Sequence, residues 1–230
     1  GLVTPELTDN GPDGELAGGA SLAEEGRLGL ALSFDGSGCV KLTNDGNFLK
    51  QGAAKRTIDL WVKAASMTGT QMLYEEGGST SGFALRVNSG NLEFRALNSG
   101  TGKTISAAYT STDWRRVTAV YDEAAMALYV DGTSVAADTA SFSSVAGEAD
   151  GAALGGTLGT DAFGGSTTGG SFSGSLDSVR VINDAVTPAA MTVTETSYQY
   201  NARSHLVLES ISGGNHKHYT YSKNGENTEV

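Results

Sequence analysis

The sequence contains very little cysteine and proline. Its single cysteine, Cys39, excludes a disulfide within the chain and a zinc site built on several thiolates. Cys39 sits in the apolar stretch SGCVKL, where we expect the thiol to pack as a small core residue. The 3 prolines contrast with 32 glycines. Together with plentiful serine and threonine, this composition favours short strands joined by tight turns over helices.

Basic residues and long apolar runs are also scarce. There are 15 Lys and Arg against 26 Asp and Glu, so the formal net charge is −11 at pH 7. A nucleic-acid surface is excluded because phosphate binding needs clustered basic side chains. No stretch reaches the roughly 18 apolar residues of a membrane-spanning helix. The surplus of carboxylates serves solubility, or it supplies oxygen ligands for Ca²⁺.

Alternating apolar residues predict an antiparallel β-protein. In TIDLWVK, Ile58, Leu60 and Val62 share one face. The stretches WRRVTAVYD and MALYVDGTSVA read as a meander that turns at Asp131 and Gly132. The expected fold class is all-β, a two-sheet antiparallel β-sandwich. Strands are expected at 31–34, 39–42, 57–63, 70–75, 82–87, 91–96, 104–109, 114–121, 126–130, 133–138, 152–155 and 172–182.

The sequence changes character twice after the central strands. Residues 139–171 are rich in glycine and serine, and GTLGTDAFGGSTTGG is typical of a surface loop. From about Tyr198 the chain is polar and carries all 3 histidines. We therefore expect one sandwich domain over residues 1–197 and a linker or appended hairpin over 198–230.

Five stretches follow one another in a characteristic order: GRLGLALSFDGSGCVKL, TIDLWVKA, DWRRVTAVYD with MALYVDGTSVA, ALGG, and FSGSLDSVRVINDAVTPAAM. In this order and spacing they resemble the laminin-G-like, concanavalin A-like jelly-roll domains of bacterial extracellular proteins. The resemblance runs from about residue 9 to residue 192. It implies a jelly roll, whose two sheets close most of their edges, and an extracellular or cell-surface location. Members of this family bind glycans, bind proteins or space other domains, so the fold does not fix the function.

Asp177, in GSLDSVRV, is the candidate metal ligand. Alternation places its carboxylate on the face of Val179 and Val181, where burial is costly unless the group is paired or binds a metal. The resemblance implies that the acid of a similar strand helps to hold a structural Ca²⁺, with the other ligands from the N-terminal turn. Here that turn is TDNGPDGE, so Asp9 and Asp13 are the expected partners. A hydrogen-bonded or Arg-paired Asp177 is the alternative.

The residues of glycan-cleaving enzymes are not found in the expected pattern. The resemblance to glucanases implies carboxylates spaced as E-x-D-x-x-E on one strand, and no such run occurs. Lyases of similar shape need a histidine and a tyrosine in the concave strands, whereas all 3 histidines lie in the tail. We therefore expect that the chain is not an enzyme.

Aromatic rings and planar polar side chains form the sites that bind sugars. Trp61 and Trp114 match the family's strand tryptophans, so we expect both in the core. In the hairpin GFALRVNSGNLEFRA, Arg86 and Arg95 lie opposite the apolar side, on an outer or concave face or on ordinary solvated surface. The expected ligand-binding residues are Tyr74, Glu75, Arg86, Arg95 and Tyr109, with Asp161–Phe163 as a further contribution.

Three functions remain open from the sequence. The first is a noncatalytic carbohydrate-binding or lectin-like module of a larger secreted or cell-surface bacterial protein, with a structural calcium ion. The second is an adhesion or protein-interaction domain on the same scaffold without a sugar site. The third is a divergent glycan-cleaving enzyme. The expected partner is a glycan or an extracellular protein, and the expected state is a monomeric module within a multidomain protein.

Overall fold

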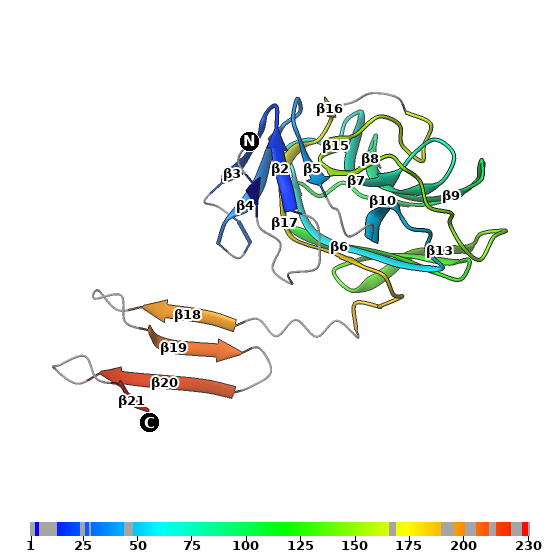
Figure 1. Cartoon of the computed structure of the whole chain (residues 1–230). Coiled ribbons are helices and arrows are strands. Elements are labelled where there is room, and N and C mark those ends of the chain that lie inside the picture. Colours follow the sequence, from blue (N-terminus) through cyan, green and yellow to red (C-terminus); the bar gives the residue numbers. More distant parts are fainter. Residues whose placement is uncertain are drawn as a thin grey trace. The chain divides into compact units, whose positions relative to one another are not determined.

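The computed structural model divides the chain into two compact units, Gly1–Pro188 and Ala189–Val230, each described by itself (Figure 1). The structure describes the backbone of residues 3–4, 13–23, 26–27, 29–43, 48–165 and 169–189, and of four strands in the second unit. Among these residues, no helix is long and apolar enough to cross a membrane.

The first unit is a sandwich of two antiparallel sheets, shown as two layers in Figure 1. This confirms the predicted fold class. One sheet has eight strands in the order β1 (Val3–Thr4), β2 (Asp13–Ala17), β5 (Cys39–Thr43), β14 (Ala152–Leu154), β7 (Thr70–Gly77), β8 (Gly82–Asn88), β9 (Asn91–Asn98) and β10 (Thr101–Ala108). The other has seven, in the order β13 (Thr133–Thr139), β12 (Ala125–Val130), β11 (Arg115–Asp122), β6 (Lys55–Ala64), β17 (Ser173–Ile182), β4 (Ala31–Asp35) and β3 (Ala20–Ala23).

Smaller elements complete the described chain. A 3₁₀ turn, η1 (Phe48–Lys50), precedes β6, and β15 (Gly156–Thr157) pairs with β16 (Gly169–Gly170). The second unit is a four-stranded antiparallel meander of β18 (Thr196–Tyr200), β19 (Leu206–Ile211), β20 (Asn215–Tyr221) and β21 (Asn227–Glu229). β18 begins two residues before the segment 198–230, for which the sequence predicts a linker or appended hairpin, and the other three strands lie within it.

The core lies between the two sheets and follows the alternation of the sequence. Ile58, Leu60 and Val62 of β6 are each 0% exposed, as the pattern of TIDLWVK predicts. They belong to one apolar cluster that includes Phe83 of β8 and Tyr121 of β11. The rings of Phe83 and Tyr121 meet edge to face at 5.3 Å, an arrangement that aromatic pairs favour.

A buried ion pair interrupts this apolar core. The Nε of Arg56 on β6 lies 2.7 Å from Oε1 of Glu76 on β7, and the hydroxyl of Tyr74 donates to Oε2 of Glu76 at 2.8 Å. Burial raises the pKa of Glu76, while the Arg56 guanidinium and the Tyr74 hydroxyl lower it. Because this pair joins strands of opposite sheets, it links the two layers of the sandwich.

Two β-bulges place residues on faces that simple alternation does not predict. On β7 the register shifts between Met72 and Tyr74, so Tyr74 faces the core. On β17 the register shifts between Asp177 and Arg180, where Ser178 takes a φ of 50°. A bulge adds one residue to one strand and so reverses the face of everything beyond it.

Candidate ligand-binding site

The outer face of β7–β10 carries most of the polar side chains that are candidates for binding. Residues paired directly across neighbouring strands lie on the same face of a sheet. Arg86 pairs with Glu93, and Arg95 pairs with both Ala84 and Thr104. Their sequence neighbours Leu85, Val87, Phe94 and Ala96 are all buried in the core cluster. The arginines therefore lie on the opposite face, where the hairpin pattern predicts them.

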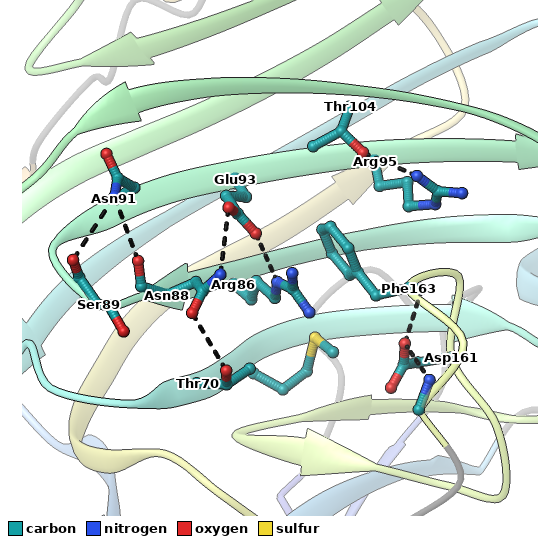
Figure 2. Close-up of polar contacts among 12 residues, drawn as sticks. Thr70, Arg86, Asn88, Ser89, Asn91, Glu93, Arg95, Thr104, Asp161 and Phe163 are labelled. Atoms are coloured by element: carbon teal, nitrogen blue, oxygen red, sulfur yellow. Dashed lines mark hydrogen bonds and ion pairs between the residues drawn. The ribbon is translucent and has the colours of Figure 1, made fainter.

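A chain of hydrogen bonds joins three strands on this face (Figure 2). The Nε of Arg86 lies 2.6 Å from Oε2 of Glu93. The other carboxylate oxygen of Glu93 accepts a bond from Nδ2 of Asn88 at 3.3 Å, and Oδ1 of Asn88 accepts one from the Thr70 hydroxyl at 3.2 Å. These contacts hold the polar groups on regular strands, which position side chains more rigidly than loops do.

The segment 158–165 folds over the same face. Oδ1 of Asp161 accepts hydrogen bonds from the backbone N–H groups of Phe163 at 2.7 Å and Gly165 at 3.3 Å. An Asp side chain that bonds the backbone two residues on is a local turn former. This turn presents the Phe163 ring to Arg86, whose Cζ lies 3.5 Å from the ring centroid (Figure 2). The segment 158–165 thus adds an aromatic ring to a polar sheet face.

Arg95 fastens the segment to the sheet. Its Nε donates to the backbone carbonyl of Ala162 at 2.6 Å, and its Nη1 donates to the Thr104 hydroxyl at 2.9 Å. Ala162 itself is buried in a small apolar cluster with Met72, Ala84 and Leu97, against which Phe163 packs. Apolar contact and a charge-assisted hydrogen bond therefore fix the position of the ring together.

Glu75 lies beneath this segment. Its pairing with Ala84 on one side and Ala153 on the other places it on the same face as Arg95, yet it is 0% exposed. Its Oε1 accepts a hydrogen bond from the Leu158 N–H at 2.8 Å, and its Oε2 has no hydrogen-bond partner among the described residues. Burial raises the pKa of Glu75 to about 9, so this carboxyl is neutral at pH 7.

The structure divides the predicted ligand-binding residues into two groups. Arg86, Arg95 and Glu75 all point to the outer face, where segment 158–165 covers Glu75. Tyr74 and Tyr109 are 0% and 4% exposed, so the expectation that they form surface aromatic platforms is wrong. For Tyr74 the physical reason is the bulge on β7, which turns the ring into the core. Burial also raises the pKa of Tyr109.

Several residues of this face were not among the predicted ones. Glu93 alternates with Arg95 in LEFRA, so the alternation that located Arg95 also locates Glu93 on the same face. Asn88 and Thr70 at strand ends, and Thr104 within β10, carried no comparable signal, because single polar residues on the exposed face of a strand are common. Phe163 was expected only as a further contribution from the glycine-rich loop. Its contact with Arg86 was not predictable, because it joins two segments that are distant in the sequence.

Asp177 lies on a different face from the one predicted. It pairs with Trp61 of β6, whereas Val179 and Val181 pack against the core. The bulge after Asp177 is the reason, and the expectation that the three residues share a face is wrong. Asp9 lies outside the described residues, and Asp13 begins β2, paired with Thr43. No three His, Cys, Asp or Glu side chains in the described part of the chain are grouped to hold a metal ion.

The outer face of the seven-stranded sheet carries a second set of charged residues. The carboxylate of Asp59 receives hydrogen bonds from Nε of Arg116 at 2.9 Å and from Nε of Arg180 at 3.1 Å. Trp61, expected in the core, lies on this face only partly buried, with Cζ of Arg27 4.9 Å from its ring. Trp114 is also only partly buried, so the core assignment of both tryptophans is wrong.

The fold and the polar sheet face define a jelly-roll β-sandwich of the lectin-like class. The chain belongs to the concanavalin A-like lectin/glucanases superfamily, because the laminin G model of that superfamily matches residues 34–191, more than half of its 230 residues. This match confirms the resemblance drawn from the sequence. No curated protein matches the chain.

Solved structures share the fold at low sequence identity. The carbohydrate-binding module CBM40 of the Ruminococcus gnavus IT-sialidase, bound to α2,3-sialyllactose, is 17% identical with a TM-score of 0.55, covering 68% of this chain and 91% of that one. Domain 4 of AbnA, an extracellular arabinanase of Geobacillus stearothermophilus, was solved in complex with arabinotriose. It is 19% identical with a TM-score of 0.60, and the match covers 80% of this chain and 89% of that domain. Mouse laminin α1 domains LG4-5 are 18% identical with a TM-score of 0.51, and the match covers 72% of this chain and 44% of the laminin chain.

Proposed function

We propose that this chain is a noncatalytic carbohydrate-binding module whose site is the outer face of β7–β10 together with segment 158–165. The observation that carries the proposal is the placement of Arg86, Glu93, Arg95 and Phe163 on one face. Guanidinium, carboxylate and aromatic groups are the ones that hydrogen-bond sugar hydroxyls and stack on the apolar side of a pyranose.

The face is preorganised for a ligand. Arg86 is fixed by Glu93 and by the Phe163 ring, and Arg95 is fixed by Ala162 and Thr104. A rigid site loses less conformational entropy on binding than a mobile one. Each polar contact with a sugar is weak, so a module binds sugars more tightly when its side chains are already held in place.

The carboxyl groups of this face support a noncatalytic role. A glycosidase needs an acid and a second carboxylate presented to one glycosidic bond. Glu75 is fully buried under the segment 158–165, and Glu93 is paired with Arg86. Neither is presented to a glycosidic bond as half of such a pair.

The family and the fold neighbours give the biological setting of the proposal. Two of the neighbours were solved with sialyllactose and arabinotriose bound. By analogy, we place this chain in a larger secreted or cell-surface bacterial protein, where it holds that protein to a glycan. The structural calcium ion, held by Asp177 with Asp9 and Asp13, is part of the same proposal.

A glycan array tests the proposal directly. Labelled wild-type protein is compared with the double variant Arg86→Gln/Arg95→Gln and with Arg115→Gln. Arg115 pairs with Asp131 at 2.7 Å on the other sheet and is the matched control. We expect binding to a restricted set of glycans by wild type and by Arg115→Gln, and loss of binding in the double variant. Absence of any bound glycan, with tight binding to a cell-surface protein, would instead support the adhesion function.

A further inference from the structure

The guanidinium group of Arg86 has unused hydrogen-bond donors. Only its Nε takes part in an interaction with a carboxylate, that of Glu93, and its two terminal nitrogens have no protein acceptor among the described residues. The side chain is 20% exposed. The Phe163 ring contacts the guanidinium, and stacking on an aromatic face leaves the in-plane N–H groups free.

Arg95 supplies a second guanidinium on the same face, directed toward Gly102 and Thr104 of β10. It lies two residues from Glu93 on β9 and is therefore a diagonal neighbour of Arg86, at a typical spacing of about 7–8 Å. Its Nη2 has no acceptor among the described residues, and its Cζ lies 5.9 Å from the Phe163 ring. The same ring thus has both guanidinium groups around it (Figure 2).

The two arginines of this face differ in their partners. Arg86 is paired with Glu93, but within the described part of the sandwich Arg95 bonds only to a carbonyl and a hydroxyl. Asp161 directs Oδ1 to two N–H groups of its own turn, and Glu75 beneath is neutral because burial raises its pKa. Glu93 and Asp161 balance the two guanidinium groups in number, so this face offers an anion the unused donors of the arginines rather than a surplus of positive charge.

We infer that the glycan bound here is acidic, and that a sugar carboxylate is bound by the terminal donors of Arg86 and Arg95 beside Phe163. This inference rests on the proposed function and specifies the ligand of that site. A planar guanidinium binds a carboxylate with two parallel hydrogen bonds, which is the strongest use of its free edge. The carboxylate comes either from a hexuronic acid or from a sialic acid, since both present the same group.

Calorimetric titration with matched ligand pairs tests the inference. Sialyllactose is compared with lactose, and a trigalacturonate is compared with its neutral methyl ester. We expect one acidic ligand to bind at least about tenfold more tightly than its neutral partner. Arg86→Gln and Arg95→Gln each remove that preference, whereas Arg115→Gln keeps it. Added salt weakens binding of the acidic ligand and leaves neutral ligands unaffected, because only the former binds through charge.

The outcomes separate the inference from the proposed function. Selective binding of sialyllactose supports a sialic acid as the source of the carboxylate, and selective binding of trigalacturonate supports a hexuronic acid. If the glycan array yields only neutral ligands, or if the acidic and neutral partners bind equally, the inference is overturned and the proposed function stands. If no saccharide binds, the proposed function itself fails.

Discussion

The ring of Phe163 lies over the guanidinium group of Arg86, with 3.5 Å between the ring centroid and Cζ. The two residues are far apart in the chain, one in the segment 158–165 and the other on β8. Their contact joins the irregular segment 158–165 to the outer face of the sheet. Because a cation over an aromatic ring is attracted to it, the contact both stabilises the segment and fixes the arginine.

Replacing Phe163 by leucine tests the importance of the ring. Phe163→Leu keeps apolar contact with the Met72 cluster but loses the attraction to the cation, so we expect a loss of about 0.5–1 kcal/mol of stability and several-fold weaker glycan binding. Phe142→Leu is the matched control, because Phe142 stacks on Tyr121 in the other sheet. Denaturant unfolding and calorimetric titration measure the two effects. Equal binding by both variants would contradict the role assigned to Phe163.

Glu75 makes stability depend on pH. Its pKa is raised from an ordinary 4.5 to about 9 in the folded protein, so the folded state keeps a proton that the unfolded state releases. The free energy of unfolding contributed by this group is fully present below the pKa that Glu75 has in the unfolded chain. It falls as pH rises toward about 9, by up to about 1.4 kcal/mol per pH unit. Glu75→Gln removes this slope. We expect the melting temperature of the variant, relative to wild type, to rise steadily with pH above about 5. Parallel melting curves across that range would show that Glu75 is not held neutral.

The ion pair of Arg56 and Glu76 is expected to tolerate joint replacement better than single replacement. Glu76→Leu leaves the buried Arg56 without its carboxylate and should cost about 3–5 kcal/mol of unfolding free energy. The double variant Arg56→Met/Glu76→Leu removes both charges and should recover most of that loss. The exposed pair of Lys55 and Asp122 is the control, and Asp122→Asn leaves the unfolding free energy nearly unchanged. A double variant as unstable as the single one would be inconsistent with this account.

The calcium ion proposed at Asp177 is tested by thermal unfolding in EDTA and in millimolar CaCl₂. A ligand that binds only the folded state raises the melting temperature. We expect calcium to raise the melting temperature of wild type and to have no effect on Asp177→Ala. Asp113→Ala, a change at an exposed loop residue, is expected to respond as wild type does. If EDTA and calcium give the same wild-type curve, the metal is not part of this protein.

Much of the sandwich was predictable from alternation, and the exceptions have physical causes. The strands that contain Ile58, Leu85 and Phe94 combine strong alternation with β-branched or aromatic residues, and they form as predicted. The strands β2 and β3 were missed, because their sequences DGELA and ASLA have little apolar alternation. The local sequence did not reveal the bulges on β7 and β17, which reversed the expected faces of Tyr74 and Asp177.

The candidate site was predictable only in part. Alternation within one hairpin located Arg86 and Arg95, because neighbouring residues point to opposite faces of a strand. The contact of Phe163 with Arg86 joins segments that only the folded sandwich brings together. The buried state of Glu75 likewise depends on the segment 158–165 that covers it.

The bound glycan is expected on the outer face of β7–β10. Amide chemical-shift mapping locates it, by adding the strongest ligand from the glycan array to ¹⁵N-labelled protein. We expect the largest shifts on the amides of β8, β9 and residues 158–165. Shifts concentrated around Trp61 and Arg180 on the other sheet would contradict this expectation and would place the site on the opposite side of the sandwich.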